Sequence, residues 1–151
     1  MRETLIQLAA ASLGAVAYAL LIRLRIRLLP WAALGGLLCW GSYLVSYGAL
    51  GGVFFPCLIA STLTELYSEV LARMLRAPST VFCIPSVIPL VPGSSLFSTM
   101  SAMVRNDWET ARSAGAATGV CALAIAIGMS LVWALFFMIR EEKKRLHHPE
   151  N

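Results

Sequence analysis

Residues 80–104 read TVFCIPSVIPLVPGSSLFSTMSAMV. The stretch is long and apolar enough to cross the hydrocarbon core of a bilayer, which takes about 20 residues in helical form. Pro85, Pro89 and Pro92, with Gly93 directly after them, interrupt it near the middle. Each proline removes a backbone N–H donor and clashes with the carbonyl one turn earlier. The spacing therefore predicts a membrane helix that is broken between Pro85 and Gly93.

The composition of the whole chain places it in a membrane. Hydrophobic residues make up 58% of the 151 residues and charged residues only 13%, whereas roughly 25% are charged in a soluble domain. A chain this apolar cannot cover itself with polar surface, so lipid must solvate much of it. We expect an all-α integral membrane protein, multi-pass in the cell membrane, with one domain.

Apolar runs on both sides of the broken stretch predict four further membrane helices. They cover about residues 4–22, 30–47, 53–75 and 106–139. The arginines after the first run indicate a retained helix rather than a cleaved signal, and Asn106 is the expected cap of the last helix. The prediction is a transmembrane domain of five helices over residues 1–139, followed by a cytoplasmic polar tail over residues 140–151.

The basic residues predict the orientation of the bundle. If the loop after the first helix is cytoplasmic, nine of the 12 basic residues lie inside, and only Arg2, Arg105 and Arg112 lie outside. The nine are Arg23, Arg25, Arg27, Arg73, Arg76, Arg140, Lys143, Lys144 and Arg145. This asymmetry fits the positive-inside rule. We therefore expect the N-terminus outside and the C-terminus inside, and we interpret the net charge of +4 as a topology signal rather than a nucleic-acid surface.

Glu65 and Glu69 are the acids within an apolar span. An intramembrane carboxylate is costly and usually faces the bundle interior or a water-filled cavity. Glu65 falls near the expected membrane centre with no local cation, which favours a role in proton coupling. Glu69 lies four residues before Arg73, so an ion pair between them is as good an interpretation as a functional role.

The broken helix is the predicted substrate site. A break frees carbonyls of the first half-helix and N–H groups of the second, and such backbone is tolerated only within protein or along a cavity. Ser94 and Ser95 would cap the second half, whose positive dipole end suits a carboxylate. The candidate substrate-binding residues are Pro89, Pro92, Gly93, Ser94 and Ser95, at the same depth as Glu65. The alternative is a packed kink without a ligand.

The remaining motifs favour structure over chemistry. The four cysteines, Cys39, Cys57, Cys83 and Cys121, lack metal-ligand spacing and are interpreted as small apolar fillers. No catalytic or phosphate-binding motif is present, so we expect neither an enzyme nor a cofactor or metal. Gly115 and Gly119 form a small-residue pair for helix packing. Trp31, Trp108, Tyr43 and Tyr47 are interpreted as interfacial anchors.

A family resemblance rests on the third and fourth helices. Residues 68–73 read SEVLAR, and residues 88–93 read IPLVPG. With Ala77-Pro78, Val81-Phe82, Ile84-Pro85, Phe97 and Thr99-Met100, these motifs resemble the threonine/serine exporter family. The match is to its C-terminal half, which in many members is a separate small subunit. The run from Ala15 to Trp40 also looks like the family.

The resemblance implies export of small amino acids such as threonine and serine, driven by the proton gradient. It also implies a larger membrane subunit that carries the matching N-terminal half, and five spans starting outside would complement five starting inside. Some two-subunit relatives are linked to succinate and similar dicarboxylates, so a dicarboxylate exporter subunit is an alternative. A non-transporting structural or assembly subunit, a channel and a homo-oligomer also stay open.

Overall fold

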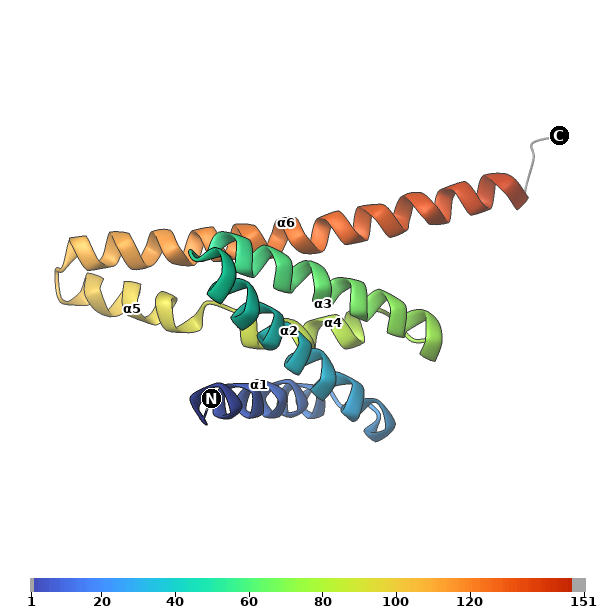
Figure 1. Cartoon of the computed structure of the whole chain (residues 1–151), viewed down its shortest axis with the longest axis horizontal. Coiled ribbons are helices and arrows are strands. Elements are labelled where there is room, and N and C mark those ends of the chain that lie inside the picture. Colours follow the sequence, from blue (N-terminus) through green and yellow to red (C-terminus); the bar gives the residue numbers. More distant parts are fainter. Residues whose placement is uncertain (1, 148–151) are drawn as a thin grey trace.

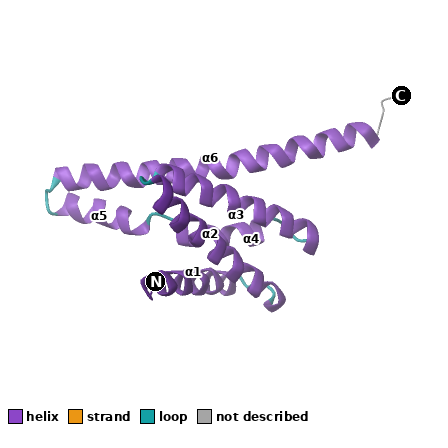
Figure 2. Cartoon of the chain, in the orientation of Figure 1, coloured by secondary structure: helices purple, strands orange, loops and turns teal. Residues whose placement is uncertain are grey.

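The structure is a computed structural model that describes the backbone of residues 2–147 and the side chains of residues 2–139. Every regular element in this part of the chain is helical, as predicted (Figure 2). The elements are α1 (Arg2–Leu21), η1 (Ile26–Leu28), α2 (Leu29–Leu50), α3 (Phe54–Leu75), α4 (Thr80–Val87), η2 (Ile88–Leu90), α5 (Gly93–Val104) and α6 (Trp108–His147).

The helices form one bundle in which α3 is central (Figure 1). It packs against α2, α4 and α6, whereas α1 lies on the outer side of α2 and also contacts α4 and η2. Because its neighbours cover it, α3 does not need an apolar surface all round. It holds five of the seven buried polar or charged residues of the described chain: Ser61, Thr64, Glu65, Ser68 and Glu69.

Small residues set how closely the helices approach. A Cβ on Gly128 of α6 would overlap the Ser61 hydroxyl of α3, and a Cβ on Gly36 of α2 would lie 2.7 Å from the Ala15 Cβ of α1. Close packing of this kind holds membrane helices together, because lipid provides little hydrophobic drive between them. By contrast, a Cβ on Gly115 would lie 3.3 Å from Thr99 and one on Gly119 would meet nothing. The predicted Gly115–Gly119 pair is therefore not where helices come closest.

The fourth predicted helix is broken, as expected. α4 continues through Pro85 into η2, and the chain then becomes extended at Val91 (ψ 126°) before α5 starts at Gly93. The two halves meet at 51°. Pro85 and Pro89 are accommodated within the first half, so the opening falls at Val91-Pro92, at the late end of the predicted interval.

The start of α6 corrects the predicted cap. Asn106 has a left-handed backbone (φ 57°) and ends α5, because its N–H donates to the Met103 carbonyl at 3.1 Å. Asp107 is the residue that caps α6, since its Oδ1 accepts a hydrogen bond from the Thr110 N–H at 3.2 Å. A side chain that accepts from the N–H three residues later is the usual geometry of an N-cap. The cap prediction was wrong by one residue.

The far end of α6 is also later than predicted. The helix continues to His147 rather than ending near Ile139, so most of the expected polar tail is helical in its backbone. Residues 140–147 contain Arg, Glu, Lys and Leu, which are good helix formers, and no Gly or Pro. The last four residues, 148–151, lie outside the described residues.

Three helices are individually long and apolar enough to cross a membrane: α1, the η1–α2 segment and α6. The bent pair formed by α4–η2 and α5 makes a fourth if its two halves belong to one span. α3 has 22 residues but carries Glu65 and Glu69 within its length. The count of five spans and the orientation remain predictions.

Candidate functional site

A cavity of about 280 Å³ lies at the helix break. Four of the five predicted substrate-binding residues line it: Pro89, Pro92, Ser94 and Ser95. Gly93, the fifth, does not. The volume is close to the lower end of the range for ligand pockets, roughly 300–1,000 Å³. An opening of a small solute's size therefore lies at the break.

Three other helices complete the wall of this cavity. Trp40 and Tyr43 come from α2, Cys57 from α3, and Ala117 and Cys121 from α6. The two rings stack with centroids 5.1 Å apart. Tyr43 was predicted to be an interfacial anchor, yet it lines the cavity. Trp40 was not predicted as a site residue, although its position within a predicted span, away from the membrane interfaces, could have indicated one.

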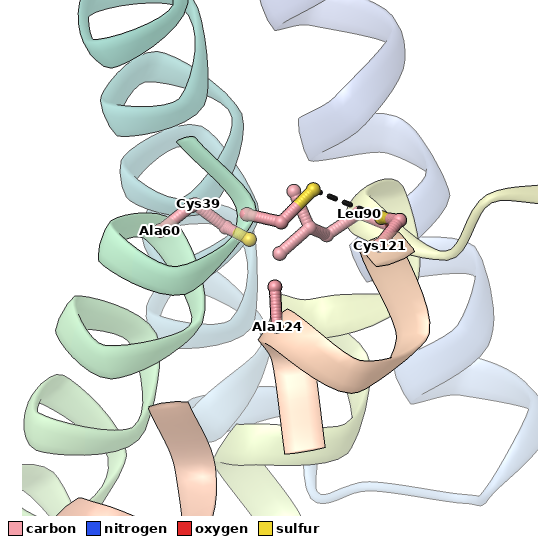
Figure 3. Close-up of a cluster of buried hydrophobic side chains, with 6 residues drawn as sticks. Cys39, Ala60, Leu90, Cys121 and Ala124 are labelled. Atoms are coloured by element: carbon pink, nitrogen blue, oxygen red, sulfur yellow. Dashed lines mark hydrogen bonds between the residues drawn. The ribbon is translucent and has the colours of Figure 1, made fainter. Parts of the chain in front are cut away.

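A small apolar cluster shares Cys57, Leu90 and Cys121 with the wall of the cavity (Figure 3). Cys39, Ala60, Leu90, Cys121 and Ala124 meet there with Cys57. The Cys57 and Cys121 sulfur atoms are 2.9 Å apart, and the Cys121 thiol lies 3.8 Å from the Leu90 carbonyl. The cysteines thus do act as small fillers, as expected, and they join α3, α6 and η2 beneath the break.

The cavity offers hydrogen-bond donors without partners. α5 starts after Pro92 with no side-chain cap, and no hydrogen bond from the Ser94 or Ser95 amide occurs within the described chain. The indole Nε1 of Trp40 has no partner either, but it is buried and does not open to the cavity. Free amides at a helix start attract anions and carboxylates. A carboxylate is accordingly the group that best fits this wall.

The two serines do not cap α5, contrary to the prediction. The Ser95 hydroxyl instead donates to the Pro92 carbonyl at 3.1 Å and lies 2.9 Å from the Thr118 hydroxyl of α6. Ser94 is exposed. The helix starts one residue before Ser94, so both serines fall within its first turn, where a side chain cannot accept from the N–H groups ahead of it. This leaves the first-turn amides open.

Glu65 lies outside this cavity, which corrects its predicted place. It is 6% exposed and lies beside Cys83 of α4 and Ser68 of its own helix. The cavity reaches α3 at Cys57, eight residues earlier and thus about 12 Å away along the axis. One Glu65 oxygen, Oε2, is buried without a hydrogen-bond partner.

Glu69 is also 6% exposed, and it lines a second cavity near the C-terminal end of α3. It forms no ion pair with Arg73, whose guanidinium instead stacks 4.3 Å above the centre of the Phe136 ring. The ion-pair interpretation of Glu69 was therefore wrong.

A buried polar face of α3 lies between the two cavities. After Cys57, the residues Ser61, Thr64, Glu65, Ser68 and Glu69 follow at spacings of one to four residues and share one side of the helix. The hydroxyls of Ser61, Thr64 and Ser68 each donate to a carbonyl one turn earlier in α3. Their oxygen lone pairs are left to accept.

Comparison with known families identifies the family of the chain. The family described as "Threonine/Serine exporter, ThrE" matches residues 7–135, which include the break, both cavities and the acidic pair. No solved structure matches the chain. The match covers more than half of the chain, and the helices are those of a membrane protein. This protein belongs to the threonine/serine exporter family and is an exporter-type transporter protein.

Proposed function

We propose that the chain is a subunit of a proton-coupled secondary transporter that exports small amino acids of the threonine/serine type. The observation that supports this most is the cavity at the helix break, which the uncapped start of α5 lines. Transporters commonly bind substrate at discontinuous helices, with the carboxylate at a half-helix N-terminus. The substrate carboxylate would bind the Ser94 and Ser95 amides.

The ammonium group has partners on the opposite wall. The ring faces of Trp40 and Tyr43 can hold a cation, an interaction worth about 0.5–2 kcal/mol. No charged side chain of the described residues lines this cavity. A neutral wall of this kind suits a small zwitterion better than a dicarboxylate.

Glu65 is the residue that we assign to proton coupling. Leaving a buried carboxylate oxygen unpartnered costs several kcal/mol when the group is charged, and the cost falls when it takes a proton. Its place on the polar face of α3, between the two cavities, gives protons a route along hydroxyl oxygens. Glu69 stands at the end of that route.

A larger partner subunit of the same family completes the proposed transporter. Among the described elements, α5 packs against α6 alone, and it projects beside α6 away from α2 and α4 (Figure 1). Its apolar side chains Leu96, Phe97 and Met100 are exposed. A partner that packs on this face would close the cavity at the break.

Reconstitution of both subunits in proteoliposomes tests the coupling. Replacement of Glu65 by Gln is expected to abolish stimulation of threonine export by a pH gradient and to preserve threonine exchange, because the neutral amide cannot carry a proton. Glu109→Gln, an exposed acid at the start of α6, is the matched control. An unchanged gradient response in Glu65→Gln would remove Glu65 from the mechanism. Export of succinate in place of threonine would favour the dicarboxylate alternative.

A further inference from the structure

The second cavity, at the end of the bundle where α3 passes into α4, has a volume of about 620 Å³. Its wall contains Glu69, Arg73 and Arg76 from the end of α3, Ser79 and Thr80 from the start of α4, and Trp133 from α6. Under the predicted orientation this is the cytoplasmic end. Charges of both signs thus line one open space, unlike the neutral wall of the cavity at the break.

Glu69 supplies the first sign of a ligand. It is more than nine-tenths buried, yet it faces the cavity, and none of the hydrogen bonds between described side chains involves it. Its natural partner, Arg73, is held by the Phe136 ring. A buried carboxylate normally has a cation or hydrogen-bond donors beside it. The cavity therefore presents a negative group that a cationic ligand group would satisfy.

The opposite charge comes from the turn between α3 and α4. Arg76 ends α3 in a left-handed backbone conformation (φ 51°), and the Ala77 N–H closes the turn on the Ala72 carbonyl at 3.1 Å. α4 then starts at Thr80, and Ser79 makes no side-chain cap. The amides of Val81 and Phe82 donate to the Pro78 and Ser79 carbonyls. Arg76, which lines the same cavity as Glu69, therefore supplies the opposite charge.

We propose that this cavity is a second binding site, which takes a small zwitterion whose ammonium pairs with Glu69 and whose carboxylate pairs with Arg76. The site lies apart from the cavity at the break, with which it shares no lining residue. It rests on the proposed function only for the choice of threonine as the ligand. Neither group alone is enough, because a cation would face Arg76 and an anion would face Glu69.

Trp133 provides the readout, since it lines this cavity and not the one at the break. The full chain in phosphatidylcholine nanodiscs is titrated with L-threonine, and the fluorescence of Trp133→Phe is subtracted. L-threonine is expected to change the Trp133 signal in a saturable manner. N-acetylthreonine, which lacks the ammonium, and threonine amide, which lacks the carboxylate, are expected to bind at least tenfold more weakly.

Two variants separate the roles of the charges. Glu69→Gln is expected to weaken the binding of threonine at least tenfold and to leave the binding of N-acetylthreonine unchanged. Arg76→Gln is likewise expected to weaken the binding of threonine and to leave the binding of threonine amide unchanged. The exposed Glu109→Gln and Arg112→Gln are the matched controls. The ligand series on the unaltered chain needs no variant, so it decides the matter even if a variant misfolds.

Binding of N-acetylthreonine or inorganic phosphate as tight as that of threonine would overturn the proposal, because it would show a simple anion site of the kind that a lipid phosphate fills. The transport assay separates this failure from that of the proposed function. Threonine export without a Trp133 response refutes the second site alone. A Trp133 response without export supports the second site and refutes the exporter role.

Discussion

Gly128 of α6 lies where α6 crosses α3, and a methyl group at this position has no room. A Cβ there would overlap the Ser61 hydroxyl and would lie 2.9 Å from both the Leu58 carbonyl oxygen and the Thr62 hydroxyl. The two hydroxyls can rotate, but the Leu58 carbonyl belongs to the backbone of α3. Gly128→Ala must therefore push α3 and α6 apart.

The magnitude follows from two opposing terms. Overpacking in a tight core costs about 1–3 kcal/mol, and the immovable carbonyl places this site near the upper value. Alanine regains about 1 kcal/mol of helix propensity relative to glycine. The expected net loss in the free energy of unfolding is thus about 2 kcal/mol.

Gly119→Ala is the matched control, because it lies on the same helix and its Cβ would meet nothing within 4 Å. It is expected to be neutral or up to about 1 kcal/mol more stable. Equilibrium unfolding in mixed detergent and sodium dodecyl sulfate, followed by circular dichroism, measures both variants. If Gly128→Ala proves as stable as Gly119→Ala, α6 does not cross α3 at Ser61, and the wall of the cavity at the break is wrong.

Two further predictions concern the helix cap and the thiol pair. Hydrogen bonds from the Thr110 side chain and backbone lower the pKa of Asp107 from its ordinary 3.8, so the charged carboxylate stabilises the fold above that pH and the stabilisation is lost as pH falls through the lower folded pKa. Asp107→Ala should therefore reduce the thermal midpoint at pH 7, by an amount that shrinks toward pH 3. A reduction that does not depend on pH would contradict the cap. Because the Cys57 and Cys121 sulfur atoms are 2.9 Å apart, mild oxidation with copper phenanthroline should form a disulfide between them. Mass spectrometry should show two thiols that no longer react with an alkylating reagent, and Cys57→Ser should abolish this loss. A disulfide that forms instead with Cys83 would refute the packing of α3 on α6.

The sequence predicted the parts of the site that depend on local chemistry. Proline and glycine act on their own backbone, so the break between Pro85 and Gly93 could be placed before any packing was known. Which of three prolines opens the chain could not, because Pro85 and Pro89 keep a helical path that only neighbouring helices can support. The level at which the cavity meets α3 also depends on packing: it does so at Cys57, about 12 Å along the axis from Glu65.

The remote walls of the cavity could not be predicted either. Trp40 and Tyr43 line it from α2. Gly35 lets α2 approach α4 closely, since a Cβ on Gly35 would overlap the Ser86 hydroxyl. Glu69 and Arg73 have the spacing of an ion pair, yet Phe136, 63 positions along the chain from Arg73, takes the guanidinium. Such competition depends on tertiary contacts that no spacing rule contains.

Labelling of Ser95→Cys, in a chain whose four native cysteines are replaced by alanine, tests most directly whether the opening at the helix break holds the substrate. Phe97→Cys, on the exposed face of the same helix, is the reference. The account predicts that a charged methanethiosulfonate reagent modifies Ser95→Cys faster than Phe97→Cys, and that L-threonine slows only the former. Equal rates, or a Ser95→Cys rate that threonine leaves unchanged, would contradict it.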